Sequence, residues 1–110
     1  MPIGQHDGIE GKIAEMAGNV VAMEAITFMT SAMVDRKAGD LRIETAMCKM
    51  WATEATWRIA DEAMQVRGGR GYETAASLEG RGEEGIPVER FLRDCRINMI
   101  VEGSSEIVRL

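Results

Sequence analysis

Apolar side chains and threonines recur along the first third of the chain at alternating steps of four and three. The residues in this series are Ile9, Ile13, Met16, Val20, Met23, Thr27, Thr30 and Val34. The spacing is that of an α-helix with one apolar face, so it predicts a long helix from about Gly8 onward. A second series widens the apolar arc in the distal half: Val21, Ala25, Phe28 and Ala32. A helix with so wide an apolar arc is predicted to pack on more than one side.

The segment 37–40 predicts the end of this helix and the start of another. Lys37 suits the negative end of a helix dipole, Gly39 suits a C-terminal cap, and Asp40 suits an N-cap. The second helix is predicted from about Leu41 to Val66, with its own stripe of Ile43, Ala46, Met50, Thr53, Trp57, Ala60 and Met64. So short a connection forces an antiparallel hairpin. Two such rods cannot bury both apolar faces against each other, so further helices are needed, from this chain or from a copy of it.

The last third of the chain alternates glycine-rich and helical patterns. Residues 68–85 carry six glycines and are predicted to be mostly loop. A short helix is predicted from Pro87 to Asn98, with the proline at its first position. The apolar run 97–101 is expected to enter the core, and Ser104 is expected to cap a final helix. Together these patterns predict an all-α fold, an antiparallel helical hairpin or bundle, within one small domain.

Composition supports this fold class and narrows the function. Nine methionines, few aromatic residues and only two prolines favour packed helices over a sheet. A net charge of −5 argues against a general nucleic-acid binder. Cys48 and Cys95 fit no metal-ligand spacing and are expected to be free thiols, and no metal site is predicted. We expect no membrane span and no signal peptide, and therefore a cytosolic or organelle-matrix protein.

Two motifs lie at the two ends of the glycine-rich segment: one overlaps its start and the other follows its end. The first is the string 65–72, in which glycines after a long helix let backbone N–H groups approach an anion closely. On glycine spacing alone, a helix cap followed by a turn is the favoured interpretation. The second is the string 87–94, where Glu89 and Arg93, and also Arg90 and Asp94, stand four residues apart. This spacing predicts a short helix with ion pairs on its surface.

The third motif is the string 102–107, Glu-Gly-Ser-Ser-Glu-Ile. Glu102 follows the apolar pair Ile100 and Val101, so its carboxylate is expected to be partly desolvated, which would make it a better base near neutral pH. Gly103 lets the backbone come close to a ligand. Taken alone, the string is better interpreted as a charged residue in a turn between two helices.

In combination, the three strings resemble the C-terminal helical domain of acyl-CoA dehydrogenases, and residues 2–5 resemble the Pro-Ile segment that opens this domain. The resemblance covers nearly the whole chain. It implies that residues 1–110 are an acyl-CoA dehydrogenase C-terminal-like domain, incomplete at both ends, whose fold resembles a truncated four-helix bundle. The parent reaction would be α,β-dehydrogenation of an acyl-CoA by an FAD-dependent oxidoreductase of fatty acid metabolism. The isolated chain is expected to be inactive.

The resemblance also assigns residues and partners. Glu102 would abstract the α-proton while a hydride leaves the β-carbon for the flavin. Cofactor contacts would come from Gln65, Gly68 and Gly69, typically to FAD on a neighbouring subunit, and from Ser104 and Glu106. An electron-transfer flavoprotein would accept the electrons, the protein would be a homo-oligomer, and its compartment would be the bacterial cytoplasm or the mitochondrial matrix. Residues 73–86 depart from the family because this segment is longer than usual. The competing class is a non-catalytic helical oligomerisation or structural module.

Overall fold

The computed structural model describes residues 1–110 and contains helices but no strand. Its elements are η1 (Ile3–Gln5), α1 (Asp7–Asp35), α2 (Arg42–Arg67), α3 (Gly69–Tyr72), α4 (Ala75–Gly80), α5 (Val88–Arg96), η2 (Ile97–Met99) and α6 (Ser105–Val108). The all-α prediction is confirmed. The bounds of α1 and α2 lie within one or two residues of those expected from periodicity, the range over which helix assignments ordinarily differ.

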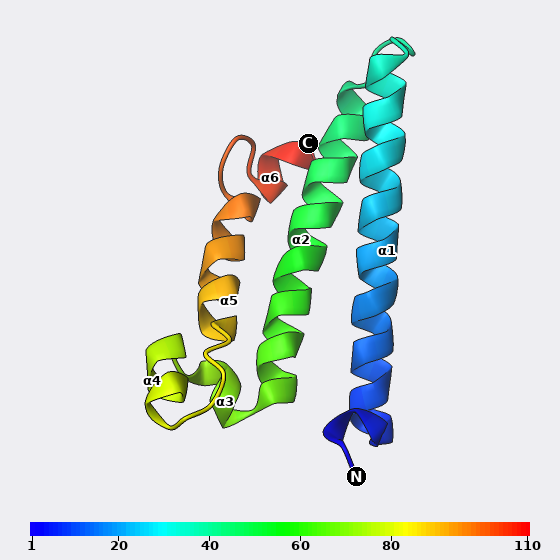
Figure 1. Cartoon of the computed structure of the whole chain (residues 1–110). Coiled ribbons are helices and arrows are strands. Elements are labelled where there is room, and N and C mark those ends of the chain that lie inside the picture. Colours follow the sequence, from blue (N-terminus) through cyan, green and yellow to red (C-terminus); the bar gives the residue numbers. More distant parts are fainter.

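Helix α2 is the central element, with α1 along one side and α5 along another (Figure 1). The helices α1 and α2 run antiparallel, because Lys12 pairs with Glu62 while the hydroxyl of Thr27 lies 3.8 Å from the sulfur of Cys48. The short helices α3 and α4 gather at the C-terminal end of α2, and α6 lies beside its other half (Figure 1). The predicted hairpin is therefore confirmed.

The connection between α1 and α2 differs in detail from the prediction. Lys37, not Gly39, is the first left-handed residue after α1, with φ of 54°. The N–H of Ala38 reaches back to the carbonyl of Met33 at 3.1 Å, so the helix ends in a Schellman-type cap built around a lysine. Asp40 is not the N-cap residue, which is Leu41. The carboxylate of Asp40 still accepts a hydrogen bond from the backbone N–H of Arg42, the first residue of α2, at 3.2 Å.

The core of the chain is thin. Only 7 of 110 residues are buried, and the buried apolar ones are Ala55, Leu78, Val88 and Cys95. All four lie in α2, α4 and α5, so α1 contributes no buried apolar side chain. The second apolar series of α1 faces solvent, with Val21 66% and Phe28 71% exposed. Two long helices and the short ones of this chain therefore leave part of the predicted apolar surface uncovered.

Helix α1 is long and apolar enough to span a membrane by length and composition, with a mean hydropathy of 1.3 over its most apolar window. The expectation that the chain has no membrane span stays a prediction, because length and composition alone do not decide it. The same criterion is met by helices that pack inside soluble bundles, and one such helix is weak support for a membrane span. Glu24 lies within the apolar part of this helix, and one face of it packs on α2.

The glycine-rich segment is more ordered than predicted, because it contains α3 and α4. Thr74 caps α4 by accepting the N–H of Ser77 at 3.2 Å, and Leu78 is fully buried. Gly71 is required by close packing: a Cβ built on it would lie 2.5 Å from the carbonyl oxygen of Met64 on α2. The glycine pattern thus marks a tight helix-to-helix junction, where the sequence predicted mainly a loop.

Helix α5 follows the prediction closely. Pro87 occupies the N-cap position, whereas the sequence predicted it at the first helical position, which Val88 occupies. Both expected ion pairs form, Glu89 with Arg93 at 2.8 Å and Arg90 with Asp94 at 3.4 Å. The side chains are mostly exposed, so these pairs contribute little to stability. The string 87–94 therefore builds the helix that carries the chain along α2 toward residue 102.

Candidate functional site

Glu102 lies in a turn with an unusual backbone. Its φ is 53°, and the next residue, Gly103, has φ of 100°. A left-handed φ is rare for a residue with a Cβ, because the side chain crowds the following carbonyl. The turn joins η2 to α6, whose N-cap is Ser104. Glu102 therefore lies in the connection between the two short helices η2 and α6.

The carboxylate of Glu102 is exposed, as are the two apolar residues before it. Ile97, Ile100 and Val101 are 53%, 56% and 44% exposed. The expectations that this run enters the core and that Glu102 is partly desolvated are both wrong for the chain on its own. The physical reason is that η2 packs only on α2 and α5, and no further element of this chain covers the outer side of η2 and of the turn.

The remaining residues of the third motif build α6. The hydroxyl of Ser104 accepts the N–H of Ile107 at 3.4 Å, so the predicted cap is confirmed. Glu106 is exposed and lines a hollow of about 320 Å³ between α2, α5 and α6. Arg109, which directly follows α6 and lines the same hollow, pairs with Glu54 of α2 at 2.6 Å. This ion pair holds the short helix against α2.

The first motif lies at the other end of α2. Gln65 is exposed in its last turn, and Gly68 ends it with φ of 59° and ψ of −141°. A Cβ placed on Gly68 or Gly69 would meet no atom within 4 Å, so a ligand can approach the backbone there. Gln65 lies 16 positions after Lys49, whose side chain contacts the Glu102 turn, so the two are about 24 Å apart along α2 at 1.5 Å per residue. The structure therefore brings the predicted site residues together as two separate clusters.

One charge pair joins the longer segment 73–86 to α3, and a second lies within the segment. Arg70 donates to Glu83 at 2.7 Å, and Arg81 pairs with Glu73. The Arg70 guanidinium holds the pKa of the Glu83 carboxyl below its usual value. Nearby, the Nε of Arg67 is buried without a hydrogen-bond partner. The segment 73–86, which departs from the family pattern, is thus folded and lies beside the glycine cluster formed by Gln65, Gly68 and Gly69.

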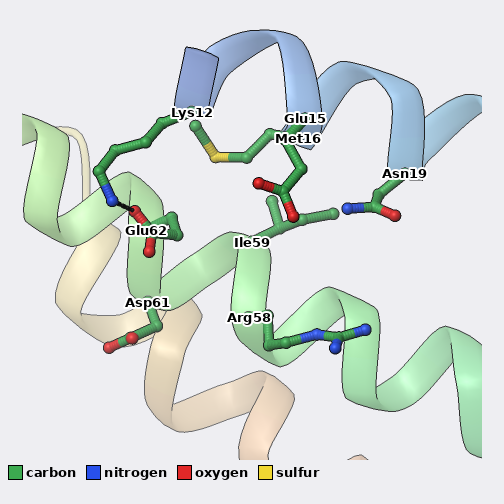
Figure 2. Close-up of a pocket in the computed structure, with 8 residues that line it drawn as sticks. All are labelled: Lys12, Glu15, Met16, Asn19, Arg58, Ile59, Asp61 and Glu62. Atoms are coloured by element: carbon green, nitrogen blue, oxygen red, sulfur yellow. Dashed lines mark hydrogen bonds and ion pairs between the residues drawn. The ribbon is translucent and has the colours of Figure 1, made fainter. Parts of the chain in front are cut away.

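A second hollow, of about 160 Å³, lies between α1 and α2. Figure 2 shows Lys12 reaching across to Glu62, while Asp61 points away from α1 and Arg58 extends sideways along α2. Its polar side chains are of both signs and partly exposed, and its one ion pair joins the two helices. This hollow has the chemistry of a solvated helix seam, and none of the predicted site residues lines it.

The two cysteines are free, Cys95 buried and Cys48 partly exposed. Burial raises the pKa of the Cys95 thiol. No group of three or more His, Cys, Asp and Glu side chains is placed to hold a metal ion.

Sequence reasoning missed Lys49. Its ammonium donates to the carbonyl oxygen of Gly103 at 2.5 Å, across 54 residues of sequence. A lysine between apolar residues of a helix, Met47 and Met50, is a signal that a polar partner lies nearby. The partner itself is not readable from the sequence, because only the packing of α6 against α2 brings it there.

A helical hairpin with a third helix packed on it and no strand defines this chain as a helical-bundle domain. A sequence model described as "Acyl-CoA dehydrogenase, C-terminal domain" matches residues 1–110. The chain therefore belongs to the acyl-CoA dehydrogenase family and corresponds to its C-terminal domain, as the three motifs suggested.

Relatives of known sequence agree with this assignment. The protein described as probable acyl-CoA dehydrogenase FadE10 of Mycobacterium tuberculosis is 50% identical over 109 residues, which are 99% of this chain and 17% of that protein. The human very long-chain specific acyl-CoA dehydrogenase, mitochondrial, is 39% identical over 102 residues, 93% of this chain and 14% of that protein. The mouse protein of the same description is 40% identical over 102 residues. The chain thus spans a small part of the length of the relatives it matches.

Proposed function

We propose that this chain supplies the catalytic base of an acyl-CoA dehydrogenase, and that Glu102 removes the α-proton of an acyl-CoA during α,β-dehydrogenation. The observation that carries the proposal is the turn at Glu102 and Gly103. Two consecutive left-handed residues hold an exposed carboxylate at a point fixed by α2. Strained backbone at a residue other than glycine persists where the surrounding structure imposes it, and such residues cluster at functional sites.

The proton and the hydride leave the substrate in different directions. In the proposed reaction, the α-proton passes to Glu102, and the C–H electron pair forms the new double bond as hydride departs from the β-carbon. FAD, when bound, supplies the acceptor for that hydride. Ser104 keeps its O–H free to donate, because its oxygen is already the acceptor of the cap bond from Ile107. We place Ser104 and Glu106 beside the cofactor on this basis and on the family resemblance.

The glycine cluster fits a dinucleotide. Gly68 and Gly69 leave open space where a Cβ would stand, and the exposed amide of Gln65 lies one turn earlier. The distance of about 24 Å along α2 between this cluster and the Glu102 turn fits an assembly in which each serves a different cofactor molecule. The exposed apolar side chains of α1 support the same assembly, since a soluble monomer rarely exposes so much apolar surface. We therefore propose a homo-oligomer.

We further propose that the chain by itself does not turn over acyl-CoA. The Glu102 carboxylate is exposed here, and catalysis by such a base depends on a closed site that excludes water and positions the substrate. In the parent protein, electrons would pass from the flavin to an electron-transfer flavoprotein, in the bacterial cytoplasm or the mitochondrial matrix.

The test is flavin reduction by saturating acyl-CoA in the full-length parent enzyme, followed anaerobically by stopped flow. Glu102→Gln keeps the shape of the side chain and removes the proton acceptor, so the reduction rate should fall by about 10²–10⁴ while flavin and acyl-CoA remain bound. Glu84→Gln, a change at a glutamate of the segment 73–86, is the matched control and should reduce at the wild-type rate. Wild-type reduction by Glu102→Gln would remove Glu102 as the base.

A non-catalytic oligomerisation module is the second candidate, and the thin core with its exposed α1 face favours it. The two candidates differ in whether the protein binds flavin. A parent protein that purifies with flavin absorbance supports the enzyme, whereas a colourless protein that still self-associates in sedimentation equilibrium supports the module.

A further inference from the structure

The turn that carries Glu102 has almost no hydrogen bonds of its own. The backbone N–H and C=O groups of Glu102 and Gly103 make no backbone–backbone hydrogen bond, whereas η2 before them and α6 after them are both internally bonded. The side chain of Glu102 makes no hydrogen bond either, and the one bond that reaches this pair of residues comes from Lys49. This single contact joins the turn to the long helix α2.

Lys49 is well placed to hold the turn against α2. It lies in the N-terminal half of α2, a 26-residue helix whose packing against α1 and α5 limits its movement. Its side chain is partly buried, so the contact with the Gly103 carbonyl is shielded from competing water. A hydrogen bond from an ionised donor is stronger and shorter than a neutral one. The ammonium therefore fixes the position of the peptide group that joins Gly103 to Ser104, one residue beyond Glu102.

The backbone conformation of Glu102 depends on the contact between Lys49 and Gly103. Glu102 has φ of 53° and Gly103 has φ of 100°, and the first value is unfavourable for a residue with a Cβ. A turn of this kind relaxes toward extended or right-handed backbone unless an outside contact holds it. Relaxation at residue 102 would swing its Cα–Cβ bond and redirect the carboxylate.

We propose that Lys49 is a positioning residue for the proton abstraction: its bond to Gly103 holds the turn in the left-handed form and so aims the Glu102 carboxylate at the substrate. This inference rests on the proposed role of Glu102 as the base. Lys49 itself does not touch the substrate in this scheme. It acts through the backbone, so its loss should slow the chemical step without weakening substrate binding.

The experiment uses the full-length parent enzyme with three variants. Lys49→Met keeps most of the length and packing of the side chain and removes the donor. Lys49→Arg keeps a charged donor and is the conservative rescue. Lys12→Met is the matched control, because Lys12 is a partly buried lysine of the same hairpin whose ammonium pairs with Glu62, far from the turn.

The first readout is the rate of flavin reduction together with the dissociation constant of the acyl-CoA. A misplacement of about 1 Å commonly costs about 10²-fold in rate. Lys49→Met should therefore reduce flavin about 10–10²-fold more slowly at an unchanged dissociation constant. Lys49→Arg should recover most of the rate, and Lys12→Met should match wild type. A substrate deuterated at the α-carbon should show an undiminished isotope effect in Lys49→Met, because proton abstraction is the slowed step.

The second readout needs no turnover. Amide hydrogen exchange in peptides covering residues 100–108 should become faster in Lys49→Met and stay unchanged in Lys12→Met. Should Lys49→Met fail to fold, Lys49→Gln, which is too short to reach Gly103 in the same geometry, provides the same comparison.

The outcomes separate this inference from the proposed function. Wild-type reduction rates and exchange in Lys49→Met overturn the positioning role, and so does a rate loss that comes with lost flavin or with a weaker substrate complex. When Glu102→Gln is slow and Lys49→Met is not, only the positioning inference falls. When Glu102→Gln reduces flavin at the wild-type rate, the proposed base falls first, and the role of Lys49 falls with it.

Discussion

Gly71→Ala is the substitution for which the structure gives the clearest expected cost. The added Cβ would lie 2.5 Å from the carbonyl oxygen of Met64, 3.0 Å from its Cα and 3.1 Å from the Cβ of Arg67. The two closest atoms belong to the backbone of α2, so they cannot turn aside as a flexible side chain would. Either α3 must move away from α2 or the last turns of α2 must distort.

The size of the effect follows from two opposing contributions to stability. Overpacking a tight contact costs about 1–3 kcal/mol. Replacing glycine by alanine lowers the entropy of the unfolded chain, which stabilises the protein by about 0.4–1 kcal/mol when the native backbone allows it. The steric clash outweighs this entropic gain, so a net loss of about 1–2 kcal/mol is expected. For a domain of this size, a loss of about 1 kcal/mol corresponds to a decrease in Tm of about 4–8 °C.

Gly80→Ala is the matched control. Gly80 is also helical, in α4, but its Cβ would meet nothing within 4 Å, so this variant should be neutral or slightly stabilised. Thermal and urea unfolding followed by far-ultraviolet circular dichroism measure both. Equal stabilities for Gly71→Ala and Gly80→Ala would refute the close packing of α3 on α2. The result also matters for function, because α3 begins at Gly69, the second glycine of the pair proposed to contact the cofactor.

Three further expectations concern other parts of the chain. Lys37→Gly should stabilise the protein by up to about 1 kcal/mol in urea unfolding, because Lys37 holds a left-handed φ of 54° that glycine adopts without strain; a destabilised variant would contradict this. The pKa of Glu83 is lowered by Arg70, so the stability from this pair is present above the ordinary carboxyl pKa and is lost as the pH falls through the lower pKa of the folded state. Urea midpoints of wild type should therefore fall more on acidification than those of Glu83→Gln, and identical pH profiles would argue against the pair. Burial raises the pKa of the Cys95 thiol, so mass spectrometry after brief iodoacetamide treatment should find Cys48 alkylated first, and earlier modification of Cys95 would count against its burial.

Local sequence determined the helices and their ends because the interactions that decide them join residues close in the chain. The four-and-three spacing of apolar positions predicted α1 and α2, and the break at residues 37–40 predicted their antiparallel order. Spacing by four predicted both ion pairs of α5, and Ser104 was recognised as a cap because its partner, Ile107, is three residues away. The three motifs identified the family from the same local strings, as the match over residues 1–110 confirms.

Tertiary structure alone decided how these pieces face solvent and one another. The sequence placed Glu102 after an apolar run and suggested burial, whereas the exposure of Ile100 and Val101 depends on whether another element covers them, and none in this chain does. The contact of Lys49 with Gly103 joins residues 54 apart and arises only from the way α6 packs on α2. Glycines at 68, 69 and 71 look alike in the sequence, yet only the third is packed against another helix. Periodicity along the chain reports which faces of a helix are apolar, but which surfaces meet is set by the packing of segments distant in sequence, and this packing separates the glycine cluster from the Glu102 turn by most of the length of α2.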